Sequence, residues 1–260
     1  MKPILIRLGP FPISSFGLFL LGAFLVGIAV VRRRGKEIGI DPSRMLDAAL
    51  YMIIGGIVAG RIGYVLANLS AFARAPQTMV TIWRDSGLTF YGALAGAVLV
   101  GAFYARRLQV PLRAFLDLFA PALALGYAVA MIGALLHGLY LGRPTGVPWA
   151  VQMFLERRHP TPIYLLLASL GSYAVLRAQE RRGPPAGMLF VLWVLLLAVS
   201  RFAVEFFVES PTVGSSGLTL AQAVNALVAV LAVATLVVLA RVVPAQPAAA
   251  AGPPEMPPAS

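Results

Sequence analysis

The chain has 260 residues, of which 59% are hydrophobic and only 12% are charged, and its mean hydropathy is +0.84. A soluble domain carries about 25% charged residues, so this composition excludes an ordinary soluble protein and indicates a membrane protein. The net charge of +11 does not indicate nucleic-acid binding, because the basic residues stand in short clusters between apolar runs.

Apolar runs of spanning length follow one another along the chain. A spanning helix needs about 20 mostly apolar residues, and such runs lie at 13–31, 46–69, 86–105, 114–141, 161–177, 186–208 and 217–241. They are continuous and lack the alternation of barrel strands. We therefore predict an all-α polytopic integral membrane protein with about seven transmembrane helices. No small-residue cleavage site follows the first run, so we expect it to remain as a span.

The connections and the C-terminal segment have a different composition. The stretches 70–85 and 142–160 are polar and rich in proline, so we expect loops with interfacial pieces there. From residue 244 onward the chain is mostly Ala and Pro, which cannot bury a core. The sequence thus predicts a transmembrane domain over 1–243 and a disordered tail over 244–260.

The distribution of Lys and Arg predicts the orientation. With seven spans, one side receives twelve basic residues and the other side seven. Cytoplasmic loops carry the excess of positive charge, so the twelve-residue side is predicted to be cytoplasmic. The N-terminus is then outside and the C-terminus is in the cytoplasm.

Arg61, Arg201 and Glu205 are charged residues within predicted spans, and a charge at the centre of a span costs about 2.5–3.5 kcal/mol on insertion scales. Arg201 and Glu205 lie four residues apart in the sixth span, so they share a helix face and are expected to pair. Arg61 and Arg201 each lie about 15 residues into an outward-running span, roughly 22 Å of rise, which places both in the outer half. One Glu cannot neutralise two guanidinium groups, and their planar forks suit a phosphate. We expect a polar site that binds a phospholipid headgroup, the alternative being a structural ion pair plus one snorkelling Arg.

Other polar residues fall near the same depth. Tyr91 lies near the outer end of the third span and His137 near the outer end of the fourth. Each has a structural alternative, an interface tyrosine and a hydrogen-bonded packing histidine respectively. Pro111 and Asp117, at the inner start of the fourth span, are expected to serve the start of that helix.

Several motifs then resemble one known family. They are Gly60-Arg61-Ile62-Gly63-Tyr64, Gly87-Leu88-Thr89-Phe90, Arg158-His159-Pro160, Arg201-Phe202-Ala203-Val204-Glu205-Phe206-Phe207 and Gly217-Leu218-Thr219-Leu220-Ala221-Gln222, together with Leu8-Gly9-Pro10. In their order and spacing, from about residue 8 to 235, these motifs resemble those of the bacterial prolipoprotein diacylglyceryl transferases.

The resemblance implies a multi-pass enzyme of the bacterial plasma membrane. It would transfer the diacylglyceryl group of phosphatidylglycerol to the lipobox cysteine of a prolipoprotein precursor, without a cofactor or a metal. Arg61 and Arg201 would hold the lipid phosphate and Glu205 would orient Arg201. Tyr91 or His137 would lie near the thiol.

The chain departs from the family signature in spans three and four. Tyr91 stands where the family has His, and Met131, Ala134 and Leu139 stand where it has Arg, Asn and Glu. His137 replaces a second Asn. An alternative function is therefore a catalytically inactive paralogue that binds phospholipid in the outer leaflet. A transporter or channel is less favoured, because the ionisable residues are too few to line a conduction path.

Overall fold

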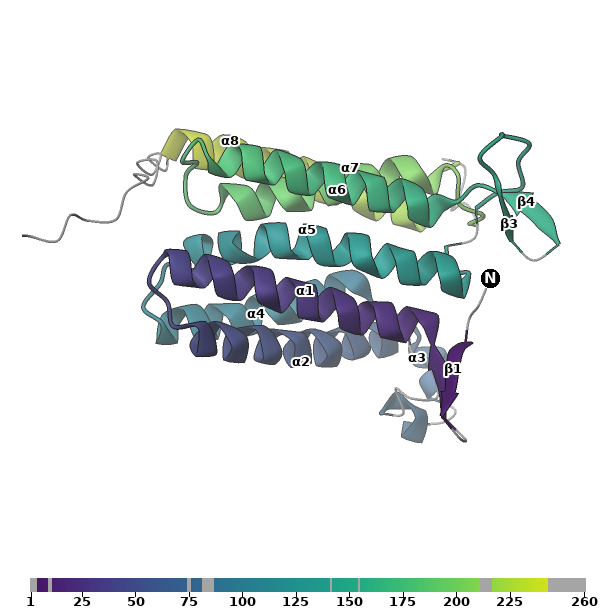
Figure 1. Ribbon diagram of the computed structural model, residues 1–260, viewed down its shortest axis with the longest axis horizontal. Coiled ribbons are helices and arrows are strands. Elements are labelled where there is room, and N and C mark those ends of the chain that lie inside the picture. The colour runs from purple at the N-terminus through teal and green to yellow at the C-terminus, as the bar shows by residue number, and fades with distance from the viewer. Residues whose placement is uncertain are drawn as a thin grey trace, which may run out of the picture.

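The computed structural model describes residues 4–8, 11–73, 76–80, 87–140, 142–153, 155–210 and 217–242. Within them, long helices extend from one end of the molecule to the other (Figure 1): α1 (Ser15–Glu37), α2 (Pro42–Ala67), α4 (Phe90–Arg107), α5 (Leu112–His137), α6 (Thr161–Glu180), α7 (Met188–Glu205) and α8 (Leu220–Val242). Each lies on one of the predicted apolar runs, so the all-α polytopic prediction is confirmed.

Six of these helices are long and apolar enough to cross a membrane, and α4 is not among them. It is as long as α7, at 18 residues, but Arg106 and Arg107 at its end lower its mean hydropathy. It nevertheless extends along the bundle beside α2. The strand β1 and the end of α8 lie at opposite ends of the molecule (Figure 1). The count of six is close to the predicted seven.

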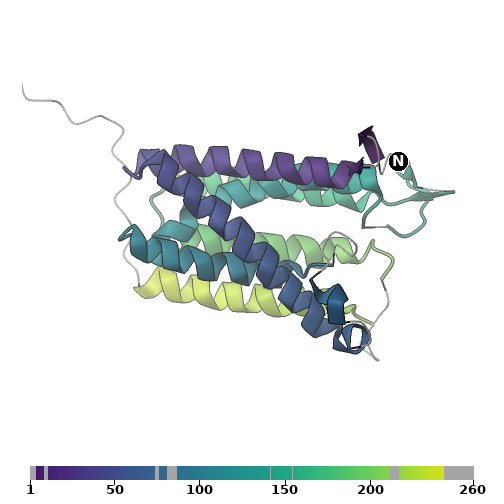
Figure 2. The same cartoon turned by 90° about the horizontal axis from the view of Figure 1, so that it is seen from below.

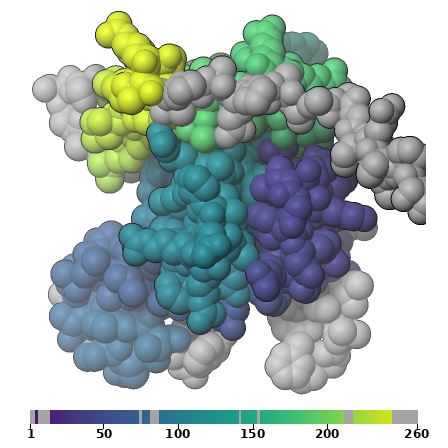
Figure 3. All heavy atoms as spheres, turned by 90° about the vertical axis from the view of Figure 1, so that its left-hand side faces the viewer, coloured from purple at the N-terminus to yellow at the C-terminus, as the bar shows by residue number. Residues whose placement is uncertain are grey.

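The helix α5 forms the centre of the bundle. It packs against α1, α4, α6 and α7, and 61% of its most apolar stretch is buried, against 17% for α1 and for α8. Viewed from the end at which α1 and α8 finish, the teal spheres lie in the centre, beside the purple α1 region and below the green and yellow α6–α8 region (Figure 3). The outer helices therefore present their apolar side chains to the membrane, and α5 presents its side chains to the protein.

Glycines bring α2 and α4 into close contact. A Cβ added to Gly96 would lie 2.5 Å from the carbonyl oxygen of Gly55, and one added to Gly92 would lie 3.0 Å from that of Ala59. Small residues allow backbones to approach in this way in membrane helices. As a result α2, which crosses the bundle obliquely (Figure 2), holds the start of α4 in place.

Short elements cap the end of the bundle that carries the N-terminus. The antiparallel strands β1 (Ile4–Leu8) and β2 (Phe11–Ser14) precede α1, and β3 (Val151–Met153) pairs antiparallel with β4 (Glu156–Arg158). A short helix α3 (Leu69–Phe72) and a 3-10 helix η1 (Pro76–Met79) follow α2. The predicted loop 142–160 thus contains a hairpin, and the predicted loop 70–85 contains helical turns.

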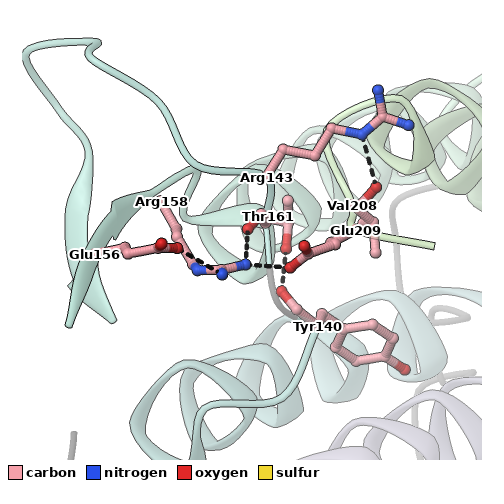
Figure 4. A network of polar contacts seen from close by, with 8 residues as sticks. Tyr140, Arg143, Glu156, Arg158, Thr161, Val208 and Glu209 are labelled. Atoms are coloured by element: carbon pink, nitrogen blue, oxygen red, sulfur yellow. Dashed lines mark hydrogen bonds and ion pairs between the residues drawn. The ribbon is translucent and has the colours of Figure 1, made fainter. Parts of the chain in front are cut away.

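A polar network fastens the segments between α5, α6 and α7 at this end (Figure 4). Arg158 forms ion pairs with Glu156 and Glu209 and donates to the Gly142 carbonyl at 3.1 Å. Arg143 donates from Nε to the Val208 carbonyl at 3.1 Å. The segment after α5 is therefore held beside the end of α7.

Polar contacts at the opposite end correct one expectation. Pro111 is the residue before α5, as predicted. Asp117, however, accepts hydrogen bonds from the backbone N–H of Gly187 at 2.7 Å and of Phe190 at 2.8 Å. Its carboxylate therefore satisfies free donors at the start of α7 and not those of its own helix. The buried Arg34 of α1 donates to the Asp117 carbonyl and pairs with Glu180 of α6.

The domain boundary and the orientation stay predictions. The tail predicted over 244–260 lies outside the described residues, and so do Arg74 and Arg84 of the orientation count.

Candidate functional site

Arg201 on α7 has a positive charge that no acidic residue in the described part of the chain neutralises. Its Nη1 donates to the hydroxyl of Tyr127 on α5 at 3.0 Å. The guanidinium carbon lies 5.5 Å from the ring centre of Phe90 and 5.8 Å from that of Tyr140. In the described part of the chain, no carboxylate pairs with it and its buried Nε has no hydrogen-bond partner. Aromatic rings and a phenol hold this cation, which leaves it free to bind an anion.

The backbone of Tyr140 is strained. Its φ of 54° lies in the left-handed region, which a residue with a bulky side chain rarely adopts. The α5 C-cap at Gly138 (φ 86°) turns the chain there, and the Thr161 hydroxyl donates to the Tyr140 carbonyl at 2.5 Å (Figure 4). A strained backbone conformation persists only where the surrounding structure stabilises it. In this conformation the Tyr140 ring lies against the Arg201 guanidinium.

Glu205 does not pair with Arg201, which overturns the expected ion pair. Its Oε1 accepts from the Thr219 hydroxyl at 3.1 Å, at the start of α8. Thr219 and Gln222 form a capping box for α8, with mutual bonds of 2.9 and 3.1 Å. The two charged side chains therefore have different neighbours, since Arg201 contacts α5 and Glu205 contacts α8. Glu205 is not placed to orient Arg201.

Arg201 and Glu205 nevertheless line the same pocket. It is shallow, with room for about one water molecule. The other residues that line it are Tyr140, Leu165, Val204 and Val208.

Tyr91 joins α4 to α8. Its hydroxyl donates to the Asn225 side-chain oxygen at 2.6 Å, and Asn225 is only 2% exposed. The Tyr91 ring lies 5.3 Å from that of Phe90, the same ring that Arg201 faces. The structure therefore brings Tyr91 close to the Arg201 cluster, with its hydroxyl proton engaged by Asn225.

His137 is the last residue of α5, and its ring lies near α1. Its Nδ1 is buried without a hydrogen-bond partner in the described part of the chain, and its ring lies 6.4 Å from that of Phe16 on α1. At Nδ1, His137 therefore lacks the hydrogen bond that the alternative of a hydrogen-bonded packing histidine would provide, and its catalytic role stays a prediction.

Arg61 has a structural environment that differs from that of Arg201. Three of its donors bind backbone carbonyls, those of Thr78 and Met79 at 2.8 Å and of Gly87 at 3.0 Å. Its guanidinium also lies 5.5 Å from the Tyr64 ring and 5.3 Å from the Phe72 ring, and Arg61 is 5% exposed. Its fork is occupied by the segment that leads into α4, so Arg61 has a structural environment, buried against protein carbonyls and not snorkelling as the alternative had it.

Sequence reasoning did not select Tyr127, Tyr140 or Asn225, and it named Thr219 only as part of a motif, without a role. Tyr127 lies at about the depth of Arg201 in its span, so the depth argument could have selected it. Thr219 belongs to a threonine–glutamine spacing typical of a helix start. Within the described residues, no group of three His, Asp or Glu side chains could hold a metal ion, and the expectation that none is needed stays a prediction.

Comparisons with known proteins identify the family. The family model for prolipoprotein diacylglyceryl transferase matches residues 3–238. The chain is 33% identical over 211 residues to the phosphatidylglycerol–prolipoprotein diacylglyceryl transferase of Chromohalobacter salexigens, covering 79% of each chain. The Geobacter sulfurreducens protein of that name is 32% identical (80% of this chain, 83% of the relative). The Trichormus variabilis protein is 31% identical (78% and 77%). The chain therefore belongs to the prolipoprotein diacylglyceryl transferase family.

Proposed function

We propose that this protein transfers the diacylglyceryl group of phosphatidylglycerol to the lipobox cysteine of prolipoproteins, the reaction named in its relatives. Its apolar helices and its family make it a multi-pass protein of the bacterial plasma membrane. The observation that carries the proposal is Arg201, a cation in a spanning helix that no described carboxylate neutralises. A lipid phosphate is the anion that a membrane supplies at that position.

The transfer makes one bond and breaks one bond. The cysteine sulfur attacks the glyceryl carbon next to the phosphate, so an S–C bond forms, the C–O bond breaks and glycerol phosphate departs. Negative charge develops on the departing phosphate, and a fixed cation lowers the barrier by stabilising it. The contacts of Arg201 with Tyr127, Phe90 and Tyr140 hold that cation in place before the reaction.

The thiol must lose its proton, since the thiolate is the nucleophile. A tyrosine, with an ordinary pKa of about 10, is a poor base at neutral pH, and the Tyr91 hydroxyl already donates to Asn225. The Nδ1 of His137 has no hydrogen-bond partner among the described residues, so this ring nitrogen is not committed to another group. We therefore favour His137 as the base, and Tyr91 as a residue that positions α4 against α8.

Complementation in a strain depleted of its own transferase tests the proposal. We expect the wild-type chain to restore growth, and Arg201→Ala to fail although it inserts at a normal level. An Asp47→Ala variant, altered at an exposed carboxylate on α2, is the control and should restore growth. If the wild-type protein is inserted and growth is not restored, the proposal is wrong.

A second candidate function has its own support. Met131 and Ala134, at two signature positions, are 3% and 0% exposed and pack with Leu165 in an apolar cluster. Two positions that are polar in the family's span-four signature are thus part of the apolar core in this chain. A paralogue that binds phospholipid without transferring it would retain phosphatidylglycerol during purification and leave a lipobox peptide unmodified.

A further inference from the structure

A second small cavity lies where α5, α6 and α7 pack against one another, and it has room for about one water molecule. The residues that line it are Tyr127 of α5, Leu165, Ser169 and Ser172 of α6, and Trp193, Leu197 and Ser200 of α7. On α6 and on α7 the lining residues recur at intervals of three or four, so each set lies on one helix face. The cavity thus combines apolar walls with three serine hydroxyls.

The three serine oxygens can each accept a further hydrogen bond. Every hydroxyl donates its proton to a backbone carbonyl: Ser169 to Ala124 of α5 at 2.8 Å, Ser172 to Ala168 at 2.8 Å and Ser200 to Leu196 at 2.5 Å. A hydroxyl oxygen also has two lone pairs that accept. The cavity therefore has acceptors on both α6 and α7, and the serines have no proton left to offer a ligand.

Two donors on residues that line the cavity have no acceptor among the described residues. The Tyr127 hydroxyl accepts from Arg201 Nη1 at 3.0 Å, and no described group accepts its own proton. The indole N–H of Trp193 has no described acceptor either, although Trp193 is only 3% exposed. Buried tyrosine and tryptophan usually have a hydrogen-bond partner, and an unmet donor in an apolar environment is costly. Serines that served only as small packing residues would leave both donors unmet.

We propose that this cavity binds one water molecule, which accepts hydrogen bonds from Tyr127 and Trp193 and donates to two of the serine oxygens. The site meets the two conditions for a buried water, since it has the volume of one molecule and two to four polar partners. The donors come from α5 and α7 and the acceptors from α6 and α7, so the water joins all three helices.

The water also determines how Tyr127 meets Arg201. When the Tyr127 proton points to the water, an oxygen lone pair remains to accept from the guanidinium. If that proton turned toward Arg201, two donors would face each other. A chain of hydrogen bonds from the serines through the water and Tyr127 therefore positions the cation, and its members reinforce one another. This consequence rests on the proposed function, because there Arg201 binds the lipid phosphate.

The water itself is tested without a measurement of activity. A high-resolution density map of the full chain should show one peak within hydrogen-bond distance of the Tyr127 hydroxyl, Trp193 Nε1 and a serine Oγ. The ultraviolet resonance Raman difference between the wild type and Trp193→Phe should show a hydrogen-bonded indole N–H. A map that resolves other buried waters but has no peak in this cavity, or an indole without a hydrogen bond, would overturn the site.

Two substitutions at Ser172 test the effect on Arg201, because this hydroxyl bonds only its own helix. Ser172→Ala leaves room for the water, so it should bind phosphatidylglycerol nearly as well as the wild type in native mass spectrometry. Ser172→Val fills the cavity with methyl groups and should weaken binding about tenfold, the effect of losing one hydrogen bond. The matched control is Thr235→Val, because its hydroxyl also donates to the carbonyl four residues earlier but lies on the exposed face of α8. It should change nothing.

Equal binding by the Ala and Val variants of Ser172 would overturn the positioning role. Thermal unfolding of the same samples shows whether Ser172→Val is destabilised. If it is, Ser200→Val fills the cavity from α7 and should give the same weakening. A peptide-transfer assay separates this inference from the proposed function. Transfer by a wild-type protein whose cavity is dry removes the inference alone, and a bound water with the expected Ala–Val difference but no transfer removes the proposed function alone.

Discussion

At the scale of single residues, two arginines with the same predicted role have different environments. Both lie in spans at similar depth, and hydropathy does not distinguish them. Arg61 is surrounded by backbone carbonyls and two rings, whereas Arg201 has the hydroxyls of Tyr127 and Tyr140 beside it and an Nε without a partner among the described residues. The direction in which a side chain in a span points depends on the neighbouring helices, and the sequence does not specify which helices these are. The first is therefore assigned to structure and the second to phosphate binding.

This assignment predicts opposite effects for two substitutions. Arg61→Ala leaves three backbone carbonyls without their donors, so we expect a loss of about 1–3 kcal/mol in the free energy of unfolding. Arg201→Ala should unfold within a few degrees of the wild type but retain less phosphatidylglycerol. Thermal unfolding in detergent, with bound lipid measured on the same samples, tests both. The assignment would be contradicted if Arg61→Ala had normal stability, or if the loss of bound lipid in Arg201→Ala were explained by lower stability alone.

The start of α2 supplies a pH test at a single carboxylate. Ser43 donates two hydrogen bonds to Asp41, one from its hydroxyl and one from its backbone N–H at 2.6 Å, and these hold the pKa of Asp41 below its ordinary value of 3.8. A group whose pKa is lowered by folding stabilises the protein above the unfolded pKa and ceases to do so as the pH falls through the folded value. Asp41→Ala should therefore lower the unfolding temperature at pH 7. The difference from wild type should narrow below pH 3.8 and vanish below the folded value, whereas a constant difference would show that the carboxylate charge is irrelevant.

At the scale of elements, the contact between α2 and α4 depends on the absence of side chains. Gly96→Val places its Cβ against the Gly55 carbonyl, where only 2.5 Å is available, so the two backbones must separate. We expect large destabilisation and lower levels of inserted protein. Gly171→Val is the matched control, because nothing lies within 4 Å of a Cβ at that α6 position. The amount of each variant in membrane fractions is the measurement. Equal amounts of the two variants would contradict the claim that the α2–α4 contact requires glycine at position 96.

The helices could be predicted from the sequence, and their mutual contacts could not. Each apolar run became a helix because a backbone in lipid must satisfy its own hydrogen bonds. The bond from Arg201 to Tyr127 joins residues 74 positions apart, and Asp117 reaches Gly187 across 70. No local pattern encodes such pairings. The β3–β4 hairpin was missed for a related reason, since a polar, proline-rich stretch predicts a loop and the pairing of three residues on each side gives little periodic signal.

At the scale of the whole molecule, the predicted orientation can be tested directly because the chain has no cysteine. Leu155, in the hairpin at one end, is 95% exposed, and the Glu37 side chain at the other end is 54% exposed. In intact spheroplasts we expect a membrane-impermeant thiol reagent to label Leu155→Cys. It should label Glu37→Cys only after permeabilisation. The reverse pattern would place the Arg201 pocket near the inner leaflet, with the N-terminus inside.

The central claim concerns chemistry at Arg201, and one measurement addresses it most directly. Purified protein is mixed with phosphatidylglycerol vesicles and a lipobox peptide, and the peptide mass is followed together with glycerol phosphate. The account predicts a diacylglyceryl thioether on the cysteine and an equal amount of glycerol phosphate, with both products lost in Arg201→Ala and the peptide carrying Cys→Ser unmodified. Lipid retained by the wild-type protein with no change in peptide mass would contradict the account and leave a lipid-binding paralogue.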